Sequence, residues 1–113
     1  MSPGDIILAR LQQSDGQIKK RPALVLAVMP PYNDLLICAV SSQLRQCVEG
    51  LDEVIAEADS DFELSGLKLT SVVRVGMVAT IPRNAALGEL GSIPQERLNR
   101  LRSRLADHIN PVG

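Results

Sequence analysis

Two short, almost uninterrupted apolar runs limit what this chain can fold into more than any other feature. Arg21-Pro22 leads into the first, which ends at Val28, and the second covers Leu35 to Val40. Runs of this length are typical of strands, and the lack of polar alternation indicates burial on both faces. Pro30-Pro31-Tyr32-Asn33-Asp34 breaks the chain between them. We therefore predict two buried strands, at residues 21–28 and 35–40.

Aliphatic patterns predict further strands at residues 5–11, 53–56 and 71–81. The last of these contains Gly76, and because glycine inside a strand marks a bend or a bulge, we expect a bend there. Ser14-Asp15-Gly16 predicts a turn after the first strand. Gly88 and Gly91 show no phosphate-loop pattern and are interpreted as turn residues.

The C-terminal segment predicts a helix. Ser92 and Gln95 have the spacing of a capping box, which places the N-cap at Ser92 and Pro94 in the first turn. Apolar residues then recur at helical spacing, at Leu98, Leu101, Leu105 and Ile109. A second face carries Arg97, Arg100 and Arg104. Asn110-Pro111 ends the helix.

Five or six short strands and one terminal helix predict a single, mainly β domain over residues 1–113. Such a set of elements favours a strongly bent sheet or a small barrel. Tyr32 and Phe62 are the only aromatic residues, so the core must be aliphatic. For the same reason, an aromatic platform for stacking nucleic acid bases is nearly excluded.

The charges are segregated along the chain, although the formal net charge is only −1. Residues 1–48 carry five basic and three acidic groups, residues 49–65 carry seven acidic and no basic groups, and residues 66–113 carry seven basic and three acidic groups. A net charge near zero argues against a nucleic acid partner, but a polyanion responds to the local field. The acidic segment lacks the spacing of a calcium loop, and we expect a solvated or partner-facing loop there.

Cysteine, histidine and hydropathy patterns exclude several classes of protein. Cys38 and Cys47 are too few for a multi-disulfide scaffold, and no Cys-x-x-Cys or His-rich spacing supports a zinc site. His108, the single histidine, is expected to have a helix-terminal or packing role, which leaves little support for Ser-His-Asp catalysis. No apolar run approaches the roughly 18 residues of a membrane helix, and Met1–Asp5 lacks signal-peptide features. We therefore expect a cytoplasmic protein without membrane contact.

Two polar clusters stand beside the predicted buried strands. Lys19-Lys20-Arg21 precedes Pro22, which biases Arg21 toward an extended backbone where a strand begins. A guanidinium on such a support is suited to holding phosphate oxygens. Ser41-Ser42-Gln43 follows the next strand, where hydroxyl and amide donors can position a phosphate or stabilise its developing charge. From the residues alone, ordinary surface charge and an ordinary turn are the alternatives.

The order of these motifs resembles the MazF/PemK family of toxin endoribonucleases. The resemblance covers residues 4–109 and rests most on Arg21-Pro22-Ala23-Leu24-Val25-Leu26. The other matching segments are Gly4-Asp5-Ile6, Asp15-Gly16, Ser41-Ser42-Gln43, Gly66-Leu67 and Ser71-Val72-Val73-Arg74-Val75. It implies a small SH3-like β-barrel with a C-terminal α-helix. It also implies a homodimer, to whose interface we expect Met77 and the strand Val72–Ile81 to contribute.

The family also implies a chemistry. Such toxins cleave single-stranded RNA, usually mRNA, without a metal or other cofactor, and a cognate antitoxin protein occupies the RNA groove. The ribose 2′-hydroxyl attacks the adjacent phosphorus, which leaves a 2′,3′-cyclic phosphate and a 5′-hydroxyl. Arg21 and Ser41 match the positions of the catalytic arginine and threonine. The segment 13–20 matches the mobile loop that frames the site, and the residues expected to bind RNA are Asp15, Lys19, Lys20, Ser42 and Gln43.

The chain departs from the family pattern at four positions. Ser41 stands where threonine is usual, and it keeps the hydroxyl but lacks the methyl that restricts the rotamer. Gly76, Met77 and Ala79 stand where the family commonly has Asp-Gln and, two positions on, a basic residue. The alternative function is therefore a toxin-fold binding module without catalysis, which binds an antitoxin or gyrase.

Overall fold

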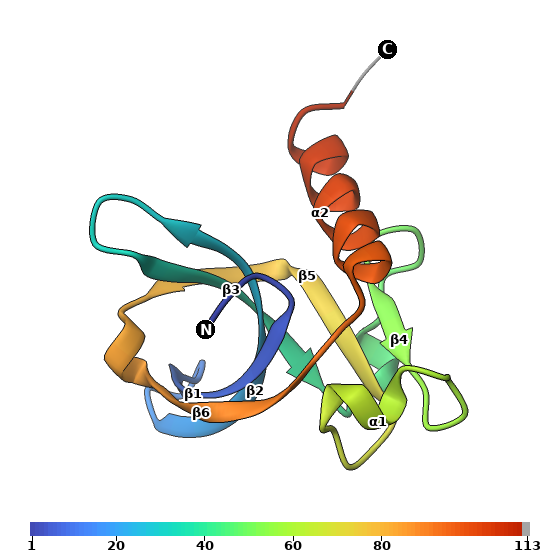
Figure 1. Ribbon diagram of the computed structural model, residues 1–113, viewed down its shortest axis with the longest axis horizontal. Helices are drawn as coiled ribbons and strands as arrows, with labels where there is room; N and C mark the ends of the chain where they lie inside the picture. Colours follow the sequence, from blue (N-terminus) through green and yellow to red (C-terminus); the bar gives the residue numbers. More distant parts are fainter. Residues whose placement is uncertain (112–113) are drawn as a thin grey trace.

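The computed structural model describes residues 1–111, so residues 112 and 113 of the predicted domain lie outside the described part. Six strands form one antiparallel sheet in the order β4-β5-β3-β2-β1-β6 (Figure 1). The strands are β1 (Asp5–Gln12), β2 (Ile18–Met29), β3 (Asp34–Ser41), β4 (Glu53–Ile55), β5 (Ser71–Ile81) and β6 (Ala86–Ser92). The helices are α1 (Phe62–Ser65) and α2 (Gln95–Ile109), with 3-10 turns η1 (Leu44–Gln46) and η2 (Arg83–Ala85). The prediction of a mainly β fold with a C-terminal helix is confirmed.

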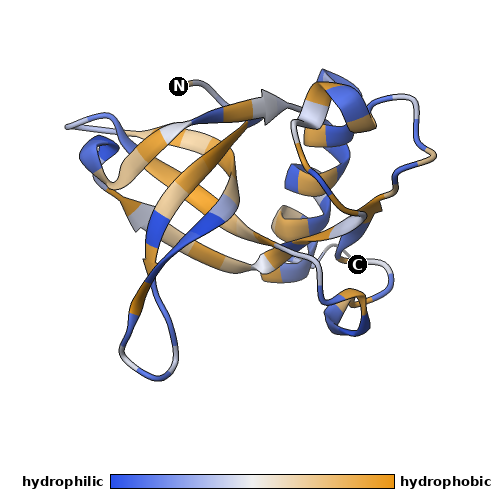
Figure 2. Cartoon of the chain, turned by 90° about the horizontal axis from the view of Figure 1, so that it is seen from below, coloured by the Kyte–Doolittle hydropathy of each residue, from blue (hydrophilic) through white to orange (hydrophobic). Residues whose placement is uncertain are grey.

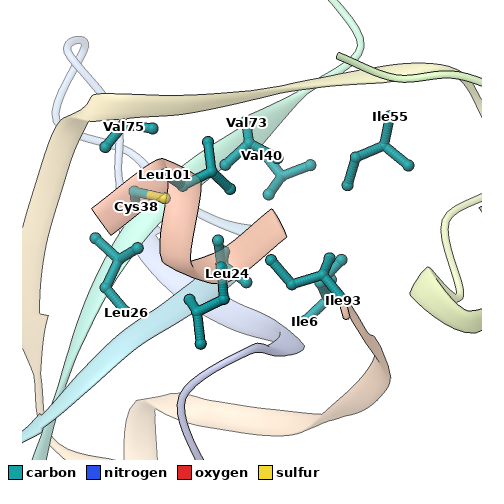
Figure 3. Close-up of a cluster of buried hydrophobic side chains, with 11 residues drawn as sticks. Ile6, Leu24, Leu26, Cys38, Val40, Ile55, Val73, Val75, Ile93 and Leu101 are labelled. Carbon is teal, nitrogen blue, oxygen red and sulfur yellow. The ribbon is translucent and has the colours of Figure 1, made fainter. Parts of the chain in front are cut away.

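The two apolar runs form β2 and β3, which pair in the middle of the sheet and are buried on both faces as predicted. Figure 2 shows hydrophobic residues along the strands and hydrophilic residues in most connecting loops. On one face, Leu24 and Cys38 pack with Leu101 of α2 (Figure 3). The opposite face carries a second aliphatic cluster made of Ile7, Ala9, Ala23, Val25, Leu35, Ile37 and Ile81. Fully burying one leucine contributes about 1.5–3 kcal/mol, so these two clusters dominate the stability of the fold.

Cys38 belongs to the core and has no reactive character. Its side chain is fully buried. Burial, with a contribution from the negative charge of Asp52, raises the pKa of the Cys38 thiol to about 12. The thiol therefore stays protonated at neutral pH and behaves as a small apolar group.

Strand β5 has the predicted bounds and the predicted irregularity at Gly76. Cys38 of β3 pairs with Val78, whereas the next residue, Ala39, pairs with Arg74, so residues 75–77 form a bulge. A buried carboxylate holds this bulge. Asp52 Oδ1 accepts a hydrogen bond of 2.9 Å from the Val75 N–H, and Asp52 Oδ2 accepts one of 2.9 Å from the Val48 N–H. The path of β5 after Arg74 is thus fixed from a distant loop.

The predicted start of the C-terminal helix is wrong. Helix α2 begins at Gln95, no side chain caps it, and Pro94 precedes it in an extended conformation. Ser92 instead pairs with Asp5 of β1 and ends β6. The backbone of Ser92 is taken up by the sheet ladder, which prevents it from acting as an N-cap. At the other end, Ile109 is 73% exposed because the last turns of α2 extend past the sheet (Figure 1).

The interpretation of Gly88 and Gly91 as turn residues is also wrong, since both lie in β6. The short helix α1 was not predicted, and it packs against β6 through two glycines. A Cβ at Gly66 would meet the Leu90 carbonyl, and a Cβ at Gly91 would meet the backbone of Leu64 and Ser65. The two backbones approach too closely for any side chain at these positions.

The acidic segment is solvated only in part, which corrects the sequence-based expectation: Glu49, Glu57 and Glu63 are exposed, whereas the other carboxylates are held by the fold. Helix α2 lies beside β4 (Figure 1), and arginines of α2 form ion pairs with carboxylates of this segment. Arg97 contacts Glu53 at 3.0 Å, Asp61 at 2.7 Å and Asp59 at 3.4 Å, and its side chain is only 12% exposed. Glu53 also pairs with Arg100 at 3.0 Å and Arg104 at 2.9 Å. Three of the seven acidic residues of 49–65, namely Glu53, Asp59 and Asp61, are therefore neutralised by arginines of α2.

The pH dependence of unfolding tests the role of Glu53. Burial raises the pKa of the Glu53 carboxyl, but the hydrogen bond from Arg100 and the charges of three arginines outweigh it, so the pKa lies below its ordinary value of 4.5. A carboxyl of lowered pKa stabilises the fold above its unfolded-state pKa, and this stabilisation is lost as the pH falls through the folded-state pKa. We expect the urea midpoint of the wild type to fall between about pH 5 and about pH 3.

The variant Glu53→Gln should have a flatter profile than the wild type. Glu63→Gln is the matched control, because Glu63 is exposed and forms no ion pair within residues 1–111. Its profile should follow that of the wild type. Equal slopes for the two variants would contradict this role of Glu53.

Candidate active site

A cleft of about 1100 Å³ lies along β1, β2, the end of β3 and the bulge of β5, and the loop 66–69 forms part of its wall. Four cationic side chains line it: Arg10, Arg21, Lys68 and Arg74. No carboxylate, imidazole or thiol is among its lining residues within 1–111. In contrast to the arginines of α2, these four cations form no ion pair to any residue that the structure describes. A molecule of net charge −1 therefore carries a cleft of uncompensated positive charge.

The pairing of β2 with β3 brings Arg21 and Ser41 together. The ladder ends at the pair Ala23 and Ala39. Arg21 lies two residues beyond Ala23 on β2, and Ser41 lies two residues beyond Ala39 on β3. Because side chains alternate along a strand, Arg21 and Ser41 project from the same face as the two alanines. The cleft thus has a guanidinium and a hydroxyl on neighbouring strands, beside small residues that leave space.

The turn after β3 orients the hydroxyl of Ser41. Its Oγ accepts a hydrogen bond of 3.1 Å from the backbone N–H of Gln43. Short hydroxyl-to-backbone bonds of this kind fix a serine side chain locally. The bond leaves the hydroxyl hydrogen free to be donated to another acceptor. The turn therefore restricts the Ser41 side chain, just as the methyl group of a threonine restricts the rotamer of that residue.

The predicted site residues divide into two groups. Arg21, Ser41, Ser42 and Gln43 line the cleft. The second group lies outside the lining, on the arm that residues 10–20 form from the end of β1, the turn and the start of β2. It consists of Asp15, Lys19 and Lys20.

The arm differs from its sequence-based prediction. Strand β2 begins at Ile18, so Arg21 lies inside the strand and not at its junction with the loop. The predicted loop 13–20 is reduced to residues 13–17, because Lys19 and Lys20 pair with Leu11 and Arg10. At the tip, Asp15 Oδ1 accepts a hydrogen bond of 2.9 Å from the Gln17 N–H. Pairing with β1 thus extends β2 through Lys19 and Lys20, although these residues lack the apolar pattern that predicts a strand.

Sequence reasoning missed three of the four cations. Arg10 ends an apolar strand, and Lys68 lies in a loop without a motif. Arg74 has one usable signal, since it is the only charged residue of β5. Apart from Arg74 and Ser71, the side of the cleft formed by β5 is apolar, with Met77, Val78, Ala79 and Ile81 in its lining.

The described residues contain neither a metal-binding cluster nor a membrane-spanning helix. Among residues 1–111, no three or more histidine, cysteine, aspartate or glutamate side chains are grouped as a metal ion would require. Over the same residues, no helix has both the length and the apolar character needed to span a membrane.

Three solved structures with a similar fold are described as a MazF toxin, an endoribonuclease bound to its cognate antitoxin, and MazE-MazF. Toxin MazF-mt6 of Mycobacterium tuberculosis superimposes with a TM-score of 0.71 at 19% identity, over 96% of this chain and 99% of that one. An endoribonuclease from a mycobacterial species, solved with its cognate antitoxin, has a TM-score of 0.73 at 13% identity, over 100% and 98% of the two chains. MazE-MazF from Deinococcus radiodurans has a TM-score of 0.68 at 20% identity, over 97% and 95%. At these identities, the likeness establishes the shared fold.

The family assignment rests on a separate comparison of sequences. A search of curated proteins returns no match. The family described as PemK-like, MazF-like toxin of type II toxin-antitoxin system matches residues 2–109, which is nearly the whole chain. With the positively charged cleft and the common fold, this match shows that the chain belongs to the PemK-like, MazF-like toxins of type II toxin-antitoxin systems.

Proposed function

We propose that this protein is an endoribonuclease toxin that cleaves single-stranded RNA, in the cell mRNA, within the cleft. The observation that carries the proposal is the cleft lining, which has four cationic side chains and no carboxylate. Such a surface attracts a phosphate backbone and repels no part of it. The family's activity supports the same substrate. Because mRNA is the proposed target, the protein would act in the cytoplasm.

The proposed reaction is an internal transesterification. The ribose 2′-oxygen forms a bond to the adjacent phosphorus, the bond from phosphorus to the 5′-oxygen breaks, and the proton lost by the 2′-hydroxyl is balanced by one gained at the 5′-oxygen. The products are a 2′,3′-cyclic phosphate and a 5′-hydroxyl, and no water is consumed. The step needs neither a metal nor another cofactor. It needs stabilisation of the negative charge that accumulates on the phosphate oxygens.

Two side chains are proposed as catalytic. Arg21 is exposed on a rigid strand and makes no ion pair within residues 1–111, so its planar donors are available to two phosphate oxygens. A guanidinium offers hydrogen-bond donors and no acceptor, so Arg21 is proposed to stabilise charge on the phosphate and not to act as a general base. Ser41 donates its hydroxyl hydrogen to the same phosphate. Ser42 and the Gln43 amide contribute further hydrogen bonds to the RNA from the same turn.

The exposed arm is proposed to contact RNA outside the cleft. Lys19 and Lys20 are exposed on the arm. From there they can contact the RNA strand where it enters or leaves the cleft. Asp15 is proposed to contact RNA from the tip of the arm, where its carboxylate accepts a hydrogen bond from the Gln17 N–H. Because these contacts are local, they involve only a small number of phosphates. We therefore expect the affinity for RNA to decrease with salt concentration in proportion to that small number.

The proposed partners are a cognate antitoxin and a second copy of this chain. Two of the similar structures contain an antitoxin bound to its toxin. An acidic antitoxin segment would compete with RNA for the same positive charge. For the homodimer, the proposed contact includes Met77 and Val78, which are 53% and 45% exposed on β5.

Incubation of the purified protein with a mixed-sequence single-stranded RNA pool in EDTA tests the function. We expect fragments with 2′,3′-cyclic phosphate and 5′-hydroxyl ends, and end mapping would give the cleavage sequence. A DNA pool of the same sequences lacks the 2′-hydroxyl nucleophile and is the matched control. Intact RNA after prolonged incubation would contradict the proposal. Together with retained antitoxin binding, it would favour a non-catalytic toxin-fold module, for which the apolar residues Met77, Val78 and Ala79 in the cleft are the motivating observation.

A further inference from the structure

Asp52 carries a buried negative charge that no cation neutralises. It is 7% exposed, and it forms no ion pair with any of residues 1–111. Burial of an unpaired carboxylate is costly unless hydrogen bonds compensate for the lost water. Here each oxygen accepts one bond of 2.9 Å from a backbone N–H, that of Val48 or that of Val75. An asparagine has a donor NH2 in place of one oxygen, so it could replace only one of the two bonds. The carboxylate is therefore suited to joining two separate segments of the backbone.

One of these segments carries the wall of the cleft beside the Ser41 hydroxyl. Ser41 ends β3, and the turn after it leads into η1. Gln43 and Gln46, which lie at the two ends of η1, both line the cleft. Val48 follows two residues later. The bond from its N–H to Asp52 thus fixes the chain where this wall ends.

The other segment is the bulge of β5, which carries another wall. Met77 and Val78 line the cleft from the bulge and from the position after it. Arg74 precedes the bulge and also lines the cleft, and its buried Nε has no hydrogen-bond partner within residues 1–111. A bulge redirects the side chains that follow it, so their placement depends on its shape. The bond from the Val75 N–H to Asp52 holds that shape.

Asp52 acts from outside the cleft and is itself held in place. It is not among the lining residues, so its carboxylate does not face the RNA site. Arg104 donates to the Asp52 carbonyl at 3.5 Å. The adjacent Glu53 pairs with Val73 in the ladder of β4 and β5, and its carboxylate contacts Arg104 at 2.9 Å. The backbone of Asp52 is therefore anchored to both α2 and the sheet.

We propose that Asp52 is a positioning residue, which holds the η1 wall and the β5 wall of the cleft in the relative placement that RNA binding requires. The inference rests on the proposed function, which places RNA in the cleft. A misplacement of about 1 Å, even one caused far from the reacting atoms, can cost about 100-fold in rate. Hydrogen bonds to an ionised acceptor are strong enough to resist such shifts. Asp52 thus favours RNA binding although its charge has the same sign as that of RNA.

The sign of the change in RNA affinity tests this role. Asp52→Asn removes a negative charge, and an effect of charge alone would therefore tighten the binding of a polyanion. Loss of positioning should instead weaken the binding of an uncleavable 2′-O-methyl RNA pool by about tenfold, which is part of the loss that a 1 Å misplacement can cause. Asp52→Glu keeps the charge and both oxygens on a longer side chain. It should also weaken binding, because the carboxylate no longer reaches both N–H groups at the same position.

Asp59→Asn is the matched control. Asp59 also accepts a hydrogen bond of 2.9 Å from a backbone N–H, that of Ala56, and it lies outside the cleft lining. This variant loses the same charge and should bind RNA as well as the wild type or slightly better. Urea unfolding of each variant gives the conditions under which it is fully folded, and the affinities are compared there. Asp52→Glu carries the test if Asp52→Asn does not fold.

Hydrogen exchange gives a readout that does not depend on RNA. The amide protons of Val48 and Val75 are held by Asp52 in the wild type. At least one of them should exchange faster in folded Asp52→Asn than in folded Asp59→Asn, because one acceptor is lost. Unchanged exchange of both would show that Asp52 does not hold the two walls, and would contradict the proposed role.

The binding outcomes separate this inference from the proposed function. If folded Asp52→Asn and Asp52→Glu bind RNA as well as Asp59→Asn does, Asp52 serves stability alone, and the inference is wrong while the proposed function stands. If the Asp52 variants weaken binding but the wild type cleaves no RNA, the positioning role stands and the endoribonuclease activity is wrong. A wild type that fails to bind the pool overturns both.

Discussion

Replacement of Arg21 with alanine is expected to slow RNA cleavage by a factor of about 10²–10³. In the proposed mechanism the guanidinium stabilises charge that develops on the phosphate during attack, and it acts in a cleft where no carboxylate weakens its field. The loss should fall mainly on kcat, because the interaction is strongest in the transition state. First-order rate constants at saturating protein concentration, in EDTA, measure this effect.

The fold should tolerate the change, which makes the result interpretable. Arg21 is exposed and forms no ion pair within residues 1–111. The urea midpoint of Arg21→Ala should therefore match the wild type. Arg45→Ala, an exposed arginine outside the cleft lining, is the matched control and should cleave at the wild-type rate. Full activity in Arg21→Ala would remove this residue from the catalytic assignment.

The largest effect on stability is expected for Arg97→Ala, at about 3 kcal/mol of unfolding free energy. Arg97 is 12% exposed and pairs with Glu53 and Asp61, whose side chains are only 11% and 13% exposed. It also donates to the Val54 carbonyl of β4 at 3.2 Å. Its removal leaves the largely buried Asp61 without its arginine partner and Glu53 with Arg100 and Arg104 alone, and it weakens the attachment of α2 to the segment beside β4. A decrease in Tm of roughly 10 °C would accompany this loss.

Arg100→Ala provides the comparison, since Arg100 contacts the same carboxylate from the surface. Its side chain is 49% exposed, and exposed ion pairs contribute about 1 kcal/mol or less. Urea unfolding of the two variants at neutral pH measures the difference. Equal losses of stability would show that burial does not decide the strength of these pairs, and would refute the account of Arg97 as the anchor of α2.

Patterns within the sequence predicted the centre of the fold well, for a physical reason. The runs that form β2 and β3 are apolar without alternation, so burial on both faces follows from composition alone. Gly76 predicted the irregularity of β5, because a glycine inside a strand often marks a bulge or a bend. The family resemblance assigned Arg21, Ser41, Ser42 and Gln43 to one site, and all four line the cleft.

The failures share one cause, which is competition between a local signal and a distant partner. Ser92 has the spacing of a helix cap, but its pairing with Asp5 draws it into β6. Lys19 and Lys20 have no strand signal, but the ladder with β1 extends through them. Arg74 was visible in the sequence only as part of a family block, and its unpartnered Nε depends on neighbours from other strands.

The distribution of charge shows most clearly how the sequence and the tertiary structure differ in what they determine. By itself, the sequence determined that acid is confined to residues 49–65 and that base lies on both sides of it, because composition along a chain needs no fold. Only the tertiary structure decided which charges cancel. It brings α2 onto the acidic segment, where Arg97, Arg100 and Arg104 find carboxylates, and it gathers Arg10, Arg21, Lys68 and Arg74 around a cleft without any. Electrostatic interactions depend on distance in space and not on separation along the chain, so a chain of net charge −1 carries a positively charged cleft.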